Sequence, residues 1–134
     1  MKGMHKISRG TGFRGVSNYC FKDPNARLLA GGNMSGTNPR ELAAEFSISR
    51  KVRDVKKPVW HTSLRLPAGE RLDDETWNSI AQEYMREMGF SEDHQFCVIQ
   101  HDDPAGQHIH IVASRVALTG HLFYGRDENL LSTK

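Results

Sequence analysis

The sequence predicts a single-domain α+β fold, a two-layer sandwich in which helices pack on one face of a mostly antiparallel sheet. Three observations predict this fold. The chain has 134 residues, which suits one domain with a hydrophobic core and is too short for two ordinary domains. Segments with helical periodicity alternate with segments of strand periodicity, and the last two strand-like segments are neighbours, as in a hairpin. We therefore expect residues 1–134 to form one domain.

Composition excludes several other classes of protein. Hydrophobic residues make up 37% of the chain and charged residues 25%, as in globular domains rather than in disordered or fibrous chains. No apolar run approaches the roughly 18 residues that cross a bilayer, and the N-terminus lacks the apolar segment of a secretory signal, so we expect no membrane insertion. Two cysteines, Cys20 and Cys97, are too few for a disulfide scaffold and favour a reducing cytoplasm.

A short strand, a helix and a second short strand are expected at the N-terminal end. Residues 1–7 form the first strand in this interpretation. Apolar side chains then recur at helical spacing, at Phe13, Val16 and Cys20. Pro24 cannot continue a helix, so this helix ends before it. Residues 27–30 then form a strand that runs into the glycine-rich turn 31–36.

The second helix has a clear start. Asn38 can accept a hydrogen bond from a backbone N–H, Pro39 suits the first helical position, and Glu41 completes an Asn-x-x-Glu capping box. Leu42 and Phe46 then lie one turn apart, on the side that we expect to be buried. Together these signals predict a helix that begins directly after Asn38.

A strand and the strongest helix follow. Side chains alternate along residues 59–66, so that one face carries Trp60, Thr62, Leu64 and Leu66 and the other carries Val59, His61, Ser63 and Arg65. The helix runs from Asp73 or Asp74 to Met88. Its apolar stripe recurs every three or four residues, at Trp77, Ile80, Ala81, Tyr84, Met85 and Met88. Gly89 stands where a left-handed C-cap ends such a helix.

The last two strands form a predicted hairpin that brings three histidines together. The strands span residues 95–101 and 108–116. If His101 lies opposite His108, antiparallel pairing also places Ile99 opposite His110, and all three histidines emerge from one face. Directly opposed Cβ atoms are then ~5 Å apart and diagonal ones ~7–8 Å, gaps that imidazoles can close around one cation.

Three histidines on one face predict a metal site. A single histidine on a strand is usually an ordinary polar side chain, but this trio is hard to explain by packing. Three neutral imidazoles also leave positions open for water or substrate, as in catalytic metal sites. Asp103 is a candidate for orienting one ligand histidine through its second ring nitrogen. The alternative, that Asp103 only shapes the turn, stays open.

The segment 101–112, His-Asp-Asp-Pro-Ala-Gly-Gln-His-Ile-His-Ile-Val, resembles the third motif of conjugative relaxases, the mobilisation nucleases of the HUH endonuclease superfamily. Other segments resemble this family in the same order. Residues 15–19 are similar to its N-terminal segment with a nucleophilic tyrosine, 31–36 to its glycine/asparagine segment, 60–64 to its central strand, and 88–90 to the residues before the metal hairpin. One position departs from the family, because Ser114 stands where an asparagine is common.

The resemblance implies a nuclease that nicks one DNA strand at the transfer origin of a plasmid or mobile element, and so initiates conjugative transfer. Tyr19 is then the nucleophile that forms a 5′-phosphotyrosine link. The metal ligands are His101, His108 and His110, and the cofactor is a divalent cation, Mn²⁺, Mg²⁺ or Zn²⁺. The ordinary pKa of a phenol is about 10, so Tyr19 also needs a base to remove its proton at neutral pH. His61 or an acidic side chain is a candidate for this base.

The resemblance also implies partners and a location. The substrate is single-stranded DNA at a transfer origin, and the further partners are accessory relaxosome proteins and the coupling protein of a secretion system, in the bacterial cytoplasm. The net charge of +2 gives no general basic excess. Candidate contacts to the DNA backbone are the basic side chains Arg14, Arg27, Arg50, Lys51 and Arg53. Residues 126–134 resemble the start of another helix, so we expect a domain truncated at its C-terminus.

Three other functions are compatible with parts of the sequence. A noncatalytic metal- or DNA-binding module of the same fold stays possible because of Ser114. A replication-initiator nuclease of the same superfamily usually has its tyrosine after the histidine pair, whereas Tyr19 precedes the pair. A nucleotide hydrolase of the histidine-triad type needs a further alternating histidine, and Val112 stands at that position. Adduct formation with DNA separates these functions from a relaxase.

Overall fold

The computed structural model of the protein describes residues 5–103 and 106–124. Residues 1–4, 104–105 and 125–134 lie outside the described part, and with them the expected continuation of the chain at 126–134. In chain order the elements are β1 (His5–Gly10), α1 (Phe13–Phe21), β2 (Arg27–Leu29), α2 (Pro39–Val52), β3 (Val59–Arg65), α3 (Asp74–Met88), β4 (Phe96–Asp103) and β5 (Gly106–Ser114). The first strand thus continues to Gly10, beyond its predicted end at residue 7, and residues 1–4 of that prediction lie outside the described part.

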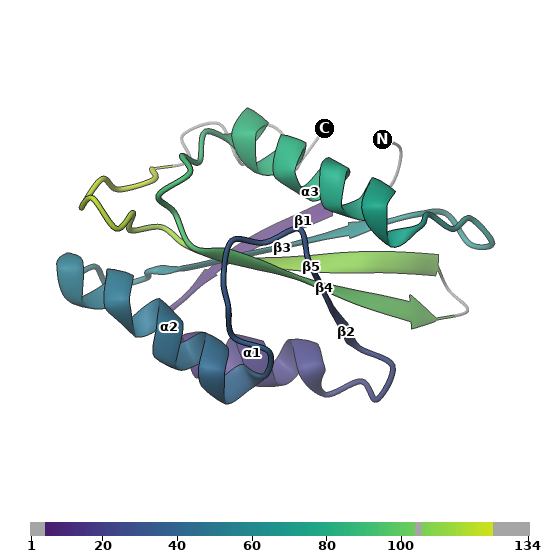
Figure 1. Ribbon diagram of the computed structural model, residues 1–134, viewed down its shortest axis with the longest axis horizontal. Helices are drawn as coiled ribbons and strands as arrows, with labels where there is room; N and C mark the ends of the chain where they lie inside the picture. The colour runs from purple at the N-terminus through teal and green to yellow at the C-terminus, as the bar shows by residue number, and fades with distance from the viewer. Residues whose placement is uncertain (1–4, 104–105, 125–134) are drawn as a thin grey trace.

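The five strands form one sheet in the order β1-β3-β5-β4-β2, and each neighbouring pair is antiparallel. The strand β5 lies in the middle of the sheet, between β3 and β4, and the short strand β2 forms one edge (Figure 1). The prediction of a single α+β domain with an antiparallel sheet is therefore confirmed.

The number of layers differs from the prediction. Helix α3 covers one face of the sheet, and α1 and α2 cover the other, so the helices lie on both faces (Figure 1). The cause is visible in β5, which is buried along its whole length. Ile109 and Ile111 pack toward α3, whereas Val112 packs toward α1 and α2. A central strand that is buried on both faces needs cover on both.

Two hydrophobic clusters hold the layers together. Under α3, Trp77 and Trp60 belong to one buried cluster, in which the Trp60 ring contacts Phe90 edge-on at a centroid distance of 4.9 Å. On the other face, Phe13 of α1 stacks on Phe46 of α2 at 4.2 Å. Each fully buried side chain of this size contributes about 1.5–3 kcal/mol to folding. Each face of the sheet thus has its own buried cluster.

The predicted helix termini are largely confirmed. The side chain of Asp73 accepts from the Thr76 N–H at the start of α3, and Gly89 ends the helix with a positive φ of 106°. At α2, Asn38 Oδ1 accepts from the Glu41 N–H at 2.9 Å. The Glu41 carboxylate, however, accepts from the backbone N–H and hydroxyl of Thr37. These hydrogen bonds with Thr37 hold the pKa of Glu41 below its ordinary value.

The β4–β5 hairpin is longer than predicted. Pairing continues to Asp103 opposite Gly106, so that only residues 104–105 connect the strands, instead of a six-residue segment. Gly106 has a φ of 137°, and a Cβ at this position would collide with the carbonyl oxygen of Leu66. Glycine therefore allows the strands to continue to the end of the hairpin. Gln107 accepts from the indole N–H of Trp77 at 2.8 Å and so ties the hairpin to α3.

Candidate active site

The predicted register of the hairpin is confirmed. His101 pairs with His108, and Ile99 pairs with His110. His108 and His110 lie on the same face of β5 as Val112, which packs toward α1 and α2. The three histidines are therefore on the face that α1 covers, opposite α3.

The three imidazoles converge. The ring centroids are 5.0 Å apart for His101 and His108, 4.5 Å for His101 and His110, and 5.2 Å for His108 and His110. One ligand atom from each residue lies within 4.8 Å of the others, and all three side chains are buried. Three closely spaced nitrogen donors fit a divalent transition-metal ion, because imidazole nitrogen is an ordinary ligand for such ions.

Each histidine of the trio also has an outer partner at a ring nitrogen. His101 Nε2 donates to the carbonyl oxygen of Cys20 at 2.5 Å, and His108 Nδ1 donates to the carbonyl oxygen of Gly106 at 3.2 Å. His110 Nδ1 shares a hydrogen bond of 2.8 Å with His61 Nε2. A carbonyl can only accept, so the donating nitrogens are protonated and the opposite ring nitrogens are those that can ligate an ion. This arrangement is typical of metal-binding histidines.

The local environment keeps the imidazole rings of His110 and His61 neutral. Burial, followed by the charges of His61, His101, His108 and Arg65, lowers the pKa of His110 to about 3. Burial also lowers the pKa of His61. Neutral imidazole is the form that binds a metal ion, so the site is prepared for one at neutral pH.

The lowered pKa of His110 predicts acid sensitivity of the metal-free protein. In the unfolded chain His110 has its ordinary pKa of about 6.5, whereas in the folded protein its pKa is about 3. The unfolded chain therefore takes up a proton at this position at a higher pH than the folded protein does. The stabilisation is therefore complete above about pH 6.5 and is lost as the pH falls toward about 3. At pH 5 we expect a loss on the order of 2 kcal/mol, measured by urea unfolding with a chelator present. A His110→Asn variant should lose less, and an unchanged pH dependence in this variant would refute the assignment.

Tyr19 lies next to the histidines. Its ring is 6.2 Å from that of His110, centroid to centroid, and nearly perpendicular to it. Helical geometry turns Cys20 into the core and Tyr19 outward, so that Tyr19 is 63% exposed. An exposed phenol beside a cluster of imidazoles is accessible to a large substrate such as a nucleic acid strand.

The predicted basic side chains lie in different places. Arg14 is exposed on α1, the helix that carries Tyr19, and donates to Asn18 Oδ1 at 3.3 Å. Arg27 lies on the α3 face of the sheet, where its guanidinium forms an ion pair of 2.6 Å with Asp74. This hydrogen-bonded pair raises the pKa of Arg27. Only Arg14 of these two lies on the side of the sheet that carries the histidines.

The other three lie at the C-terminal end of α2 or just after it. Arg50 donates to the backbone carbonyl of Thr11 at 2.7 Å, and Arg53 donates to that of Gly120 at 3.3 Å. Lys51 is exposed. Two of these side chains therefore anchor loops.

Ser114 lies far from the histidines along the same strand. It is four residues beyond His110, about 13 Å along a strand. Its hydroxyl shares a hydrogen bond of 2.9 Å with the hydroxyl of Ser49 on α2 and accepts from the Val116 N–H at 3.1 Å. Ser114 thus ties α2 to the end of β5, and the basic stretch 50–53 lies near this end of the sheet.

Two residues at the site, Arg65 and Cys20, were not among the predicted site residues. Arg65 faces the histidine side, pairs with His108 across β3 and β5, and donates to the Gly106 carbonyl at 3.2 Å. The strand alternation had placed it on the face of His61. Cys20 contacts His101 through its carbonyl oxygen, and burial raises the pKa of its thiol to about 12. The side chain of Asp103, the predicted candidate for orienting a ligand histidine, lies outside the described part of the chain.

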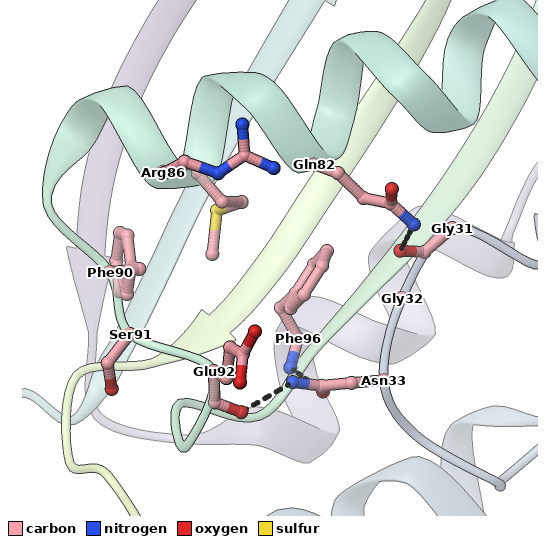
Figure 2. Close-up of a pocket in the computed structure, with 10 residues that line it drawn as sticks. Gly31, Gly32, Asn33, Gln82, Arg86, Phe90, Ser91, Glu92 and Phe96 are labelled. Carbon is pink, nitrogen blue, oxygen red and sulfur yellow. Dashed lines mark hydrogen bonds between the residues drawn. The ribbon is translucent and has the colours of Figure 1, made fainter.

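A separate pocket lies beneath α3. It has a volume of about 400 Å³ and is lined by Gly31, Gly32, Asn33, Gln82, Met85, Arg86, Phe90, Ser91, Glu92 and Phe96. Figure 2 shows Arg86 and Gln82 on the helix above Phe96. Asn33 Nδ2 donates to the His94 carbonyl, and Asn33 Oδ1 accepts from the Phe96 N–H, so that the glycine/asparagine segment holds the start of β4. None of the lining residues is a predicted site residue.

The comparisons with known proteins agree with this geometry. A family model described as relaxase, MobA/VirD2-like, nuclease domain matches residues 16–131, a region that includes Tyr19 and the three histidines. No significant match was found among curated proteins or among solved structures. Within the described residues, no helix combines the length and the apolar character that a membrane span requires.

Proposed function

Because the chain belongs to the MobA/VirD2-like nuclease domains of relaxases, a family of DNA-nicking enzymes, we propose that it nicks one DNA strand by transesterification with Tyr19. The observation that supports this proposal most strongly is the position of the exposed Tyr19 ring. Its centroid is 6.2 Å from that of His110, a member of the histidine cluster. The proposed setting is a transfer origin in a bacterial cytoplasm, with accessory relaxosome proteins and a coupling protein as partners.

In the proposed reaction, the phenol of Tyr19 gives up its proton to a base or to solvent and its oxygen forms a bond to phosphorus, while the bond from phosphorus to the 3′-oxygen breaks. The strand then carries a 5′-phosphotyrosine link, and the 3′-oxygen leaves as a hydroxyl after taking up a proton. The link conserves the phosphodiester bond energy, so that the reverse attack by a 3′-hydroxyl rejoins the strand. Exposure of Tyr19 allows the scissile phosphate to approach from solvent.

We propose that His101, His108 and His110 hold a divalent cation beside this phosphate. A bound cation would neutralise a non-bridging phosphate oxygen and stabilise the charge of the transition state. The donor set consists of nitrogen atoms, which suit Zn²⁺ well and Mn²⁺ more weakly, whereas Mg²⁺ prefers oxygen ligands. His61, through its hydrogen bond to His110, would fix the orientation of that ring.

The described residues also suggest how the strand is held. Arg65 lies on the histidine side of β3, and Arg14 is exposed on the helix that carries Tyr19. We propose that these two guanidinium groups contact phosphates on either side of the scissile bond. Arg27 already pairs with Asp74 on the opposite face, which favours a structural role.

The chelator experiment tests the proposal. The protein is incubated with a labelled single-stranded oligonucleotide that spans the cognate transfer origin, with Mn²⁺ or with a chelator. We expect a covalent protein–DNA adduct that survives denaturation, forms with Mn²⁺ and is absent with the chelator. The same sequence as a duplex should give far less adduct, since the scissile phosphate must reach the histidine cluster.

Other outcomes would contradict the proposal. Nicked DNA with a free 5′-phosphate and no adduct would show water to be the nucleophile. Metal binding without any nick would favour a noncatalytic module, and release of a nucleoside monophosphate from a dinucleotide would indicate a nucleotide hydrolase.

A further inference from the structure

A second group of ligating side chains lies beside the histidine trio. Cys20 of α1, His61 of β3 and His110 of β5 each place one ligand atom within 4.8 Å of the others. The two groups have only His110 in common. We propose that Cys20, His61 and His110 form a second metal position, selective for thiophilic divalent cations such as Zn²⁺, Co²⁺ and Cd²⁺. This inference stands on the cluster itself and does not depend on the nicking reaction.

The distances require little movement for such an ion to bind. His61 Nε2 and His110 Nδ1 are 2.8 Å apart and share a hydrogen bond. Two nitrogens that ligate one tetrahedral Zn²⁺ at about 2.0–2.1 Å lie roughly 3.3 Å apart. A separation of the two rings by roughly half an ångström is therefore sufficient. The cation would then take the place of the proton that the two imidazoles share.

Cys20 completes the group from the opposite side. Its side chain is fully buried on the side of α1 that faces the sheet, where β3 and β5 carry the two histidines. On binding a cation the thiol loses its proton to solvent, and the thiolate becomes a ligand. The charge of the cation offsets that of the buried thiolate, so the pair can occupy an apolar environment.

The sulfur atom sets the selectivity. Thiolate ligands favour Zn²⁺ and similar borderline or soft ions, whereas Mg²⁺ and Mn²⁺ prefer oxygen ligands. The trio of His101, His108 and His110 contains nitrogen donors only. The two positions therefore differ in chemistry although they lie side by side, and a thiophilic ion at Cys20 would engage the ring nitrogen of His110 that His61 now holds.

Cobalt spectroscopy tests the second position directly. A thiolate that ligates Co²⁺ gives a near-ultraviolet charge-transfer band, and imidazole ligands do not. We expect this band when the purified protein is titrated with Co²⁺. Cys20→Ser should abolish the band. His61→Asn removes a ligand, so it should lower the Co²⁺ affinity seen through the band by more than roughly 100-fold, beyond the loss typical of an outer partner. Cys97→Ser, a change at the other buried cysteine, should leave it intact.

A double variant separates this position from the histidine trio. His101→Ala combined with His108→Ala removes two of the trio's ligands but leaves Cys20, His61 and His110 in place. We expect the band to persist in this protein, with the fold checked by circular dichroism. Co²⁺ binding without the band in the unmodified protein would overturn the proposal while leaving the nitrogen site intact. Loss of the band in the folded double variant, or in Cys97→Ser alone, would also overturn it.

Discussion

Tyr19→Phe is expected to abolish the covalent adduct with single-stranded DNA, a decrease of roughly a thousand-fold or more in nicking. The phenyl ring of the variant keeps its contact with His110 but has no oxygen that can bond to phosphorus. Because the side chain is 63% exposed, loss of the hydroxyl should leave the fold and the metal affinity unchanged. The measurement is adduct formation on denaturing gels, followed by mass spectrometry of the peptide that carries the nucleotide.

Tyr124→Phe is the matched control for this variant. Tyr124 has the same exposed fraction of 63%, but it lies in the segment after β5, where its backbone carbonyl accepts from Arg9. This variant should form the adduct at the normal rate. An adduct that persists in Tyr19→Phe, or that maps to a peptide without Tyr19, would remove Tyr19 from the reaction.

His108→Ala is expected to weaken binding of Mn²⁺ or Zn²⁺ at the histidine trio by at least about 100-fold. Loss of an outer partner of a metal ligand typically lowers the metal affinity by roughly 10–100-fold, and loss of the ligand itself lowers it further. Each histidine of the trio offers one ligand nitrogen, so removal of His108 leaves only two of the three. Isothermal titration calorimetry with each ion measures the change.

His121→Ala serves as the control for the loss of an imidazole. His121 is exposed and lies in the segment after β5, outside both groups of ligating side chains in the described part of the chain. We expect the metal affinity of this variant to match that of the unmodified protein. A normal affinity in folded His108→Ala would exclude His108 as a ligand.

Local sequence signals predicted much of the fold. The apolar stripe of α3, its Asp73 cap and Gly89 are short-range features, and each appears where its spacing placed it. The hairpin register followed from one assumption, that His101 lies opposite His108, because antiparallel pairing then fixes every other pair in the two strands. These features depend on residues that are close in sequence.

The arrangement of the layers could not be predicted in the same way. The amphipathic pattern of α1, α2 and α3 shows that each helix has a buried side, but it does not say which face of the sheet that side covers. The clue was the central strand, since Val112 is apolar on one face and Ile109 and Ile111 are apolar on the other. A strand that is buried on both faces is covered on both.

The histidine trio was predictable, whereas its surroundings were not. Three alternating positions in one hairpin are enough to place His101, His108 and His110 together. The contact of His61 with His110 joins residues 49 positions apart, and that of Cys20 with His101 joins residues 81 positions apart. Such contacts depend on how α1 and β3 pack around β5. The sequence carries no local signal for that packing.

The central claim is that three imidazoles of the β4–β5 hairpin hold one divalent cation beside Tyr19. Diffraction from crystals soaked in Mn²⁺, with the anomalous signal of manganese, locates that ion directly. The account predicts a peak within coordination distance of nitrogens from His101, His108 and His110, on the side of the sheet that carries Tyr19. A peak at another position only, or imidazoles that turn away from the ion, would contradict it.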